Sequence, residues 1–480
     1  MKRLIYIFLL SVVLLSCKKG FLEIVPKGSL IAEKLADYQL LMNSIRFYEY
    51  TNGLPTLVLG DDVAAEETIF QNQSPASQKA FKWENVLYEA TETAPEFTNY
   101  VTNLYACNKI IEEVMGATDG TEAGKKSLRA EALAARAWIN FQLINLYAKP
   151  YAASTAATDP GFPIIVKADI TVNSYSRGTV QEMYDQIVND LLASIDNLPV
   201  QNFPQTRMSK AAAKAILGKV YLYMGKNEQA LVQFNSAFSD LAASPVSVAL
   251  YNYNETFAPG GSFLPIGFFG PNYPGNNSND FKECLIAITN NGGNYNGNGF
   301  GNGGLVLDEK TAQLYASSDF RLNFYSNTFD DGSVIPGGRI RKYALQYVKV
   351  GMQLPDLYLL RAEVKARLND LAGAKEDVEW LRQNRMPPAD AIVPATIAAD
   401  QTELIKFIID ERIREFAGEG YRWFDMRRLY LDPIYTGTSY THTLHTISGG
   451  AISYSLRPER LVFQFPTSVM TANPGMANNP

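Results

Sequence analysis

The chain has 480 residues, of which 46% are hydrophobic and 19% are charged, and its formal net charge is −6. This composition is too apolar for a disordered chain and offers no broad basic surface for a nucleic acid backbone. It predicts a folded protein with a sizeable core, arranged as one large or two interleaved domains, without a nucleic acid partner.

The N-terminus has the pattern of a lipoprotein leader. Lys2 and Arg3 precede an apolar run that ends just before Cys17. The run is shorter than the ~20 residues that a membrane-spanning helix requires, and no later run reaches that length. We therefore expect residues 1–16 to be a signal peptide, Cys17 to carry the lipid, and the mature protein to be held on a membrane rather than through it.

Cysteines are too few for a disulfide framework. Once Cys17 carries lipid, only Cys107 and Cys284 remain, and they lie far apart in the sequence. A single disulfide between them is one interpretation. Two buried, free thiols are the favoured one, because unpaired cysteine is among the most frequently buried residue types.

Two segments in the first half of the chain have the three- and four-residue spacing of amphipathic helices. The first is 128–148, which has Trp138 beside its apolar stripe and is ended by Pro150. The second follows Thr179 and Glu182, which have the spacing of a capping box, and its apolar face continues until Pro199. Both segments are predicted to be helices.

Residues from Lys210 onward follow the spacing of a tetratricopeptide repeat. Small side chains at two positions would let the helices of a hairpin approach closely, while aromatic side chains fill the space between hairpins. A second copy of the spacing lies near Pro355, and because one unit cannot bury its own apolar face, several must stack. The residues assigned to the repeat are Leu217, Gly218, Tyr221, Ala230, Phe234, Ala362 and Ala374.

A last helical pair is predicted from Thr402 to Leu429, with an interruption at Gly418 and Gly420. Glu411 and Glu415 lie one turn apart on it, which raises the possibility of the two carboxylates of a glycoside hydrolase. Structural ion pairs are the favoured interpretation, because five arginines crowd the same element. They are Arg412, Arg414, Arg422, Arg427 and Arg428.

The stretch 252–304 is rich in Gly, Asn, Pro and aromatic residues and predicts long surface loops. Aromatic faces suit the C–H faces of sugar rings, and amides suit hydroxyl groups, so a neutral carbohydrate is one expected ligand. A flexible spacer is the alternative. Aromatic residues in 61–105 are either further contacts or core. The predicted contacts are Trp83, Tyr88, Phe268, Tyr273, Asn294, Tyr295 and Asn296.

Residue patterns for chemistry are scarce. His442 and His445 are spaced to share one face of a metal site, but no cysteine or acidic cluster accompanies them, so a surface loop is the favoured interpretation. The chain has no phosphate-binding loop, nucleophile elbow or dinucleotide fingerprint. We expect no catalytic residues, no metal and no cofactor.

Taken together, these features resemble the SusD/RagB family of nutrient-binding outer-membrane lipoproteins over nearly the whole mature chain. The resemblance is carried by the residues after Cys17, by the helix that ends at Tyr147, and by three further segments. These are 355–363, the highly specific run 411–428, and the C-terminal residues from Phe465 to Pro480.

The resemblance implies a mostly α fold: an α/α superhelix of about four tetratricopeptide-like helical pairs, with long loops and minor β structure forming a ligand face. It also implies an outer-membrane, cell-surface location, a glycan ligand and a SusC-like TonB-dependent transporter as partner. The alternatives are a protein-interaction scaffold, a peptide-binding member of the same family and a surface hydrolase. The expected regions are 1–16, 17–50, 51–250, 251–350 and 351–480.

Overall fold

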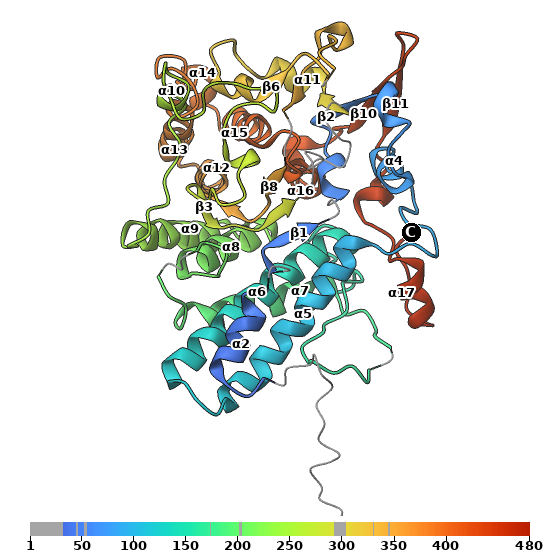
Figure 1. Ribbon diagram of the computed structural model, residues 1–480, viewed down its shortest axis with the longest axis vertical. Coiled ribbons are helices and arrows are strands. Elements are labelled where there is room, and N and C mark those ends of the chain that lie inside the picture. The colour runs from blue at the N-terminus through green and yellow to red at the C-terminus, as the bar shows by residue number, and fades with distance from the viewer. Residues whose placement is uncertain are drawn as a thin grey trace, which may run out of the picture.

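Helices form most of the structure, as the sequence predicts. The computed structural model describes residues 32–480 except 45–46, 52–54, 173, 201–203, 292–303, 330 and 344–345. Figure 1 shows the helices stacked along the long axis of the molecule, with loops and short strands at one end and along one side.

The first group of helices packs around α6. It consists of α2 (Leu35–Met42), α5 (Pro95–Glu113), α6 (Glu122–Tyr147) and α7 (Val180–Ile195). The predicted capping box of α7 is present, because Thr179 N donates to Glu182 Oε2 at 2.7 Å and Glu182 N donates to Thr179 Oγ1 at 3.1 Å. These two bonds satisfy backbone donors at the helix start.

The first predicted repeat is the helical pair α8 (Lys210–Tyr223) and α9 (Asn227–Ala242). Gly218 lies where the two helices meet, and a Cβ atom there would stand 2.5 Å from the ring of Phe234. Ala230 and Phe234 are fully buried. Gly225 turns the chain between the helices with a φ of 73°, which glycine adopts without strain.

The second repeat is the pair α12 (Leu354–Arg367) and α13 (Leu371–Gln383). Ala362 and Ala374 are fully buried at the corresponding positions, and Pro355 lies in the first turn of α12, where its missing amide costs little. The last pair is α15 (Gln401–Phe416) and α16 (Tyr421–Leu429). Because α12 contacts α9, α13 and α15, the pairs stack as a helical superstructure.

Short helices lie in the segments outside these pairs. They are α3 (Glu67–Phe70), α4 (Pro75–Phe81), α10 (Tyr253–Thr256), α11 (Glu309–Gln313), α14 (Ala395–Ala398) and α17 (Thr467–Ala472). Among the helices that the structure describes, none has both the length and the apolar composition needed to cross a bilayer.

The strands are short and join distant parts of the sequence. One sheet has the order β1-β4-β8 and a second has the order β11-β10-β2-β5, beside the pairs β3-β9 and β6-β7. The bounds are β1 (Glu49–Thr51), β2 (Val63–Glu66), β3 (Cys284–Ile286), β4 (Thr289–Asn291), β5 (Leu305–Leu307), β6 (Tyr325–Ser326), β7 (Arg341–Lys342), β8 (Tyr347–Lys349), β9 (Met352–Gln353), β10 (Thr441–His445) and β11 (Ala451–Ser455).

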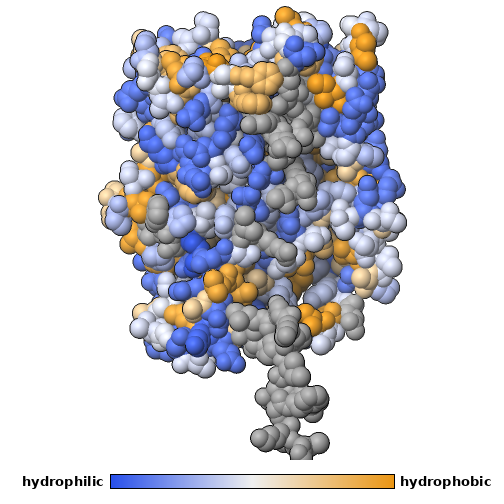
Figure 2. Space-filling model, viewed as in Figure 1, coloured by the Kyte–Doolittle hydropathy of each residue, from blue (hydrophilic) through white to orange (hydrophobic). Residues whose placement is uncertain are grey.

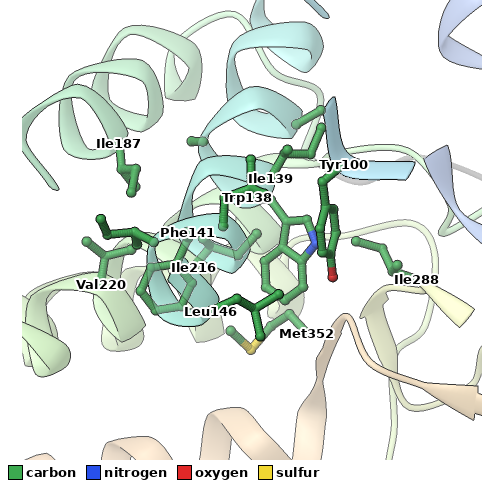
Figure 3. Close-up of a cluster of buried hydrophobic side chains, with 14 of the residues drawn as sticks. Tyr100, Trp138, Ile139, Phe141, Leu146, Ile187, Ile216, Val220, Ile288 and Met352 are labelled. Carbon is green, nitrogen blue, oxygen red and sulfur yellow. The ribbon is translucent and has the colours of Figure 1, made fainter. Parts of the chain in front are cut away.

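The largest of the hydrophobic clusters joins the helical layers to the strands. Figure 3 shows Trp138 and Phe141 of α6 beside Ile216 of α8, with Ile288 and Met352 approaching from the strand region. All five side chains are buried. The core therefore fixes the loop-bearing end of the molecule relative to the helices.

The two remaining cysteines are buried and free. Cys107 lies in α5 and Cys284 begins β3, and neither forms a disulfide. The favoured sequence interpretation is therefore confirmed. Burial raises the pKa of the Cys284 thiol to about 12, so it is protonated at neutral pH.

Candidate functional site

The predicted ligand loops gather over one end of the helical stack. In Figure 1 the segment containing α10, α11 and β6 lies above α12 and α15. It is tied to the scaffold through β3, which pairs with β9 directly before α12. Rigid helices thus carry irregular loops, an arrangement that is common for binding surfaces.

Phe268 and Phe269 form the exposed tip of this segment. Their side chains are 61% and 41% exposed, and the rings meet edge to face with centroids 4.9 Å apart. The turn is closed by backbone bonds between Gly267 and Gly270, and a Cβ atom at Gly270 would stand 2.6 Å from Tyr343. The structure therefore presents Phe268 to solvent, in the place expected for a ligand contact.

A narrow cavity lies beside this tip. Asn276 Nδ2 donates to Phe269 O at 2.9 Å and to Pro271 O at 3.0 Å, which connects the aromatic tip to the cavity rim at Pro274 and Gly275. The cavity volume is about 70 Å³, which accommodates a few water molecules. Its aromatic wall consists of Tyr253, Tyr273, Phe324, Tyr325, Tyr347 and Phe416.

Tyr273 is a wall residue of the cavity rather than a surface residue. It is only 6% exposed, and its ring lies 4.6 Å from that of Phe324. Among the described residues, its hydroxyl has no hydrogen-bond partner. Burial raises the pKa of Tyr273 beyond its ordinary range, so the group remains a neutral hydrogen-bond donor.

Charged groups form the remainder of the wall. Lys342 Nζ lies 2.5 Å from Glu419 Oε1 and donates to Ala417 O at 3.1 Å. Arg321 pairs with Glu415 at 2.9 Å. Asp280, Glu283, Lys349, Gln353 and Arg414 complete the polar lining.

Glu411 and Glu415 are held in buried ion pairs. Glu411 lies 2.6 to 2.7 Å from the guanidinium groups of Arg321, Arg382 and Arg414. Burial alone would raise the pKa of Glu411, but Arg414 and the other two guanidinium groups outweigh it and hold the pKa far below its ordinary range. The interpretation of these acids as structural is therefore supported by their contacts.

The arginines that pair with these acids differ from most of those that the sequence indicated. Of the five predicted partners, only Arg414 contacts Glu411, and Glu415 instead pairs with Arg385 and Arg321. Arg412 binds Asp356 and Asp425, Arg428 binds Glu363 and Asp425, and Arg422 binds Asp61. Arg427 donates to the carbonyl of Ala148. Helix packing brings in carboxylates that sequence proximity does not reveal.

Trp83 and Tyr88 belong to a different region and do not line the cavity of Tyr273. Trp83 is 4% exposed, and its Nε1 donates to Leu59 O at 3.2 Å. Tyr88 is partly buried, and its hydroxyl donates to Glu96 Oε2 at 2.7 Å. Because their polar atoms bond within the protein, the structure favours the core interpretation of both residues.

The surface-loop interpretation of His442 is wrong. His442 lies within β10, is fully buried, and stacks between Phe81 and Trp83 with ring centroids 4.4 and 3.8 Å away. Its ring nitrogens lie 2.6 Å from the carbonyl oxygens of Phe81 and Gly60. The described residues contain no cluster of three or more His, Cys, Asp or Glu side chains suited to a metal ion.

Several predicted residues lie outside the described residues: Cys17, Asn294, Tyr295 and Asn296. The flanking strands locate the ends of the Asn-rich stretch. β4 pairs with β1 and β8 on one side, and β5 pairs with β2 on the other. Sequence reasoning did not find Lys349 and Tyr347, because the three-residue strand β8 is too short to show a pattern of its own.

Family models match both ends of the chain. One described as "Starch-binding associating with outer membrane" matches residues 21–222, and one described as "SusD family" matches residues 339–480. The chain is also 24% identical over 355 residues to SusD-like protein P2 of Formosa agariphila, which is 66% of this chain and 68% of that protein. SusD-like protein P38 of the same organism is 24% identical over 325 residues, 56% of this chain and 62% of that protein.

Solved structures share the fold along nearly the whole chain. A SusD superfamily protein from Bacteroides vulgatus has a TM-score of 0.69 at 21% identity, and covers 93% of this chain and 99% of its own. A SusD-like carbohydrate binding protein from the same species has a TM-score of 0.65 at 16% identity, covering 92% and 97%. A laminarin binding SusD-like protein has a TM-score of 0.61 at 17% identity, covering 93% and 98%.

Proposed function

The chain belongs to the SusD/RagB family, and we propose that it is a non-catalytic binding protein that captures a glycan at the outer membrane. The observation that supports this most directly is the exposed aromatic tip beside a cavity walled by tyrosines and charged groups. Aromatic faces bind the C–H faces of sugar rings, while hydroxyl and charged groups orient the polar substituents.

A binding role fits the chemistry of the acidic residues. Glu411 and Glu415 are the carboxylate pair that a hydrolase interpretation requires, and both are held by arginines. The general acid of a hydrolase needs a raised pKa, and the general base needs access to water. The ion pairs instead lower the pKa of both Glu411 and Glu415. We therefore propose capture without turnover.

The mature protein is proposed to be anchored through Cys17 and to load its ligand into a SusC-like TonB-dependent transporter. The leader pattern and the family resemblance support this arrangement. Acyl chains would hold the protein on the membrane, so the helical stack needs no spanning segment of its own.

Calorimetry on the protein lacking residues 1–17 tests the proposal, with laminarin and starch oligosaccharides as probes. Binding without hydrolysis is expected. Replacing both tip residues, Phe268→Ala with Phe269→Ala, should weaken binding by about 1 to 3 kcal/mol, on the scale of stacked aromatic contacts. The control is Trp380→Ala, which removes an aromatic side chain that is 53% exposed on α13 and should leave affinity unchanged.

The same titrations distinguish the alternative functions. An absence of binding to all oligosaccharides, together with retained binding to a barrel transporter, would favour a protein-interaction scaffold. Release of reducing ends from either polysaccharide would contradict a non-catalytic role.

A further inference from the structure

Lys349 ends β8 and lines the same cavity as Tyr347. It is 4% exposed. Residues two apart on a strand share a face, so Tyr347 and Lys349 both contribute to this wall. The cavity thus contains a buried ammonium group.

This ammonium group has weak partners. Its Nζ lies 3.4 Å from Asn277 O and 3.3 Å from Ser278 O, and 5.2 Å from the centroid of the Phe281 ring. Within the described residues no carboxylate lies within 4 Å of it, although Asp280 and Glu49 attract it from farther away. Burial outweighs that attraction and lowers the pKa of Lys349.

Other buried cations near the cavity are paired. Lys342 contacts Glu419, Arg385 contacts Glu283 and Glu415, and Arg321 contacts three carboxylates. Burying a charge without a counter-ion costs far more free energy than burying a pair. Lys349 is therefore an exception that calls for a partner from outside the chain.

Tyr273 adds a second incomplete donor to the same cavity. Its hydroxyl is buried and has no partner in the part of the chain that the structure describes, whereas buried polar groups in proteins are nearly always bonded. An ammonium group and a phenol hydroxyl both donate hydrogen bonds. Asp280 and Glu283 also line the cavity, but Asp280 accepts from the Tyr251 hydroxyl and Glu283 accepts from Arg385. The two donors without a close partner therefore favour a ligand group that accepts hydrogen bonds and carries negative charge.

The size of the cavity limits what can enter. A volume of about 70 Å³ suits one small functional group, while a whole sugar ring would remain outside among the exposed aromatic residues. On the premise of the proposed glycan-binding function, we propose that this cavity receives an acidic substituent of the captured glycan, a carboxylate or a sulfate ester, which pairs with Lys349. Tyr273 supplies a further donor in the same cavity.

Calorimetry with three oligosaccharides of equal length tests this inference: a neutral glucan, a uronate and a sulfated glucan. The wild type is expected to bind at least one acidic oligosaccharide about tenfold or more tightly than the neutral one. Lys349→Gln should abolish that preference, so that the variant binds acidic and neutral oligosaccharides with equal affinity. Tighter binding of the uronate would identify a carboxylate as the substituent, and tighter binding of the sulfated glucan would identify a sulfate ester.

Matched variants separate charge from folding. Lys167→Gln removes an exposed lysine and should retain the preference, and Lys349→Arg should keep part of it because the charge remains. Tyr273→Phe, which removes only a hydroxyl, should weaken acidic binding severalfold. Circular dichroism of each variant reports whether the helices are intact.

A ligand-independent measurement keeps the two proposals distinct. Sodium sulfate and sodium acetate should raise the melting temperature of the wild type more than that of Lys349→Gln at equal ionic strength. Equal shifts, or equal affinity for neutral and acidic oligosaccharides in both proteins, would overturn the acidic-substituent inference while leaving glycan capture intact. Failure of every oligosaccharide to bind would instead contradict glycan capture itself.

Discussion

Asp62 is a buried carboxyl group whose surroundings favour its neutral form. Burial raises its pKa to about 6, Asp61 adds to the rise, and the backbone amide of Gly418 and the charge of Arg422 oppose it. Gly418 N donates to Asp62 Oδ2 at 2.7 Å, so this carboxyl group connects the start of β2 to the turn between α15 and α16. Its protonation therefore acts on a junction between the sheet and the last helical pair.

The raised pKa predicts how Asp62 affects stability with pH. The folded state holds the proton more tightly than the unfolded state, so this contribution is complete below about pH 4 and is lost as pH rises through about 6. The shift corresponds to roughly 3 kcal/mol. Asp62→Asn stays neutral, so its stability relative to wild type should increase by up to that amount between pH 4 and pH 7. Urea titrations at pH 4 and pH 7 measure the difference in stability between the two proteins. The same difference at both pH values would contradict the prediction.

Glu411 shows the opposite behaviour, because three guanidinium groups hold it ionised in the core. Replacing one partner of a buried charge cluster leaves uncompensated charge behind. Glu411→Gln should therefore lower the free energy of unfolding by about 3 kcal/mol or more.

Chemical denaturation of Glu411→Gln checks this value, with Glu403→Gln as the control on the same helix. Glu403 pairs with Lys406 at 2.9 Å on the surface, where ion pairs contribute little. Comparable losses in both variants would refute a special role for the buried cluster.

Adjacent loop residues show why the candidate site could be predicted only in part. Phe268 and Tyr273 belong to one Gly-, Asn- and aromatic-rich stretch, which correctly predicts irregular structure. Composition does not distinguish the exposed ring of Phe268 from the buried ring of Tyr273, because that difference depends on contacts with Phe324 and Tyr343. Lys349 carries no local signal, since its burial arises from pairing between β8 and β4.

At the scale of elements, helices were more predictable than strands. Helical periodicity and caps are local, so the segments after Thr179 and Lys210 could be recognised from the sequence. The strands contain two to five residues and pair across large separations, as Ala65 does with Leu444. Strands of two or three residues are too short to display alternation, and their pairing depends on the tertiary fold.

Gly218 permits a testable prediction about the first helical pair. An added Cβ atom would stand 2.5 Å from the ring of Phe234, which is fully buried. Gly218→Ala should therefore destabilise the fold by about 1 to 3 kcal/mol through overpacking, even though alanine favours helices. Thermal unfolding monitored at 222 nm measures the loss.

A second substitution tests the cause. Combining Gly218→Ala with Phe234→Leu should recover part of the loss, because the smaller side chain vacates the space that the new methyl group needs. Gly116→Ala is the control, since an added Cβ there meets nothing within 4 Å. If the losses of the two single variants simply add in the double variant, the strain of Gly218→Ala does not come from its contact with Phe234.

At the scale of the whole molecule, the expected regions 51–250, 251–350 and 351–480 share their structural elements. The sheet β11-β10-β2-β5 takes strands from all three, and one hydrophobic core contains Trp138, Ile288 and Phe465. On the face in Figure 2, hydrophobic side chains occur in separate groups among polar ones, so the larger apolar clusters are inside. The regions are therefore better described as successive parts of one folded unit.

This arrangement predicts that the chain from residue 32 onward unfolds in one cooperative transition. Removing β2 from its sheet exposes β10 and β5 together, so no region can unfold without uncovering apolar surface of another. Scanning calorimetry should give a single peak whose calorimetric and van't Hoff enthalpies agree, and tryptophan fluorescence and circular dichroism should report the same midpoint. A separate low-temperature peak that disappears when 251–350 is deleted would show instead that the loop-bearing region folds independently of the helical scaffold.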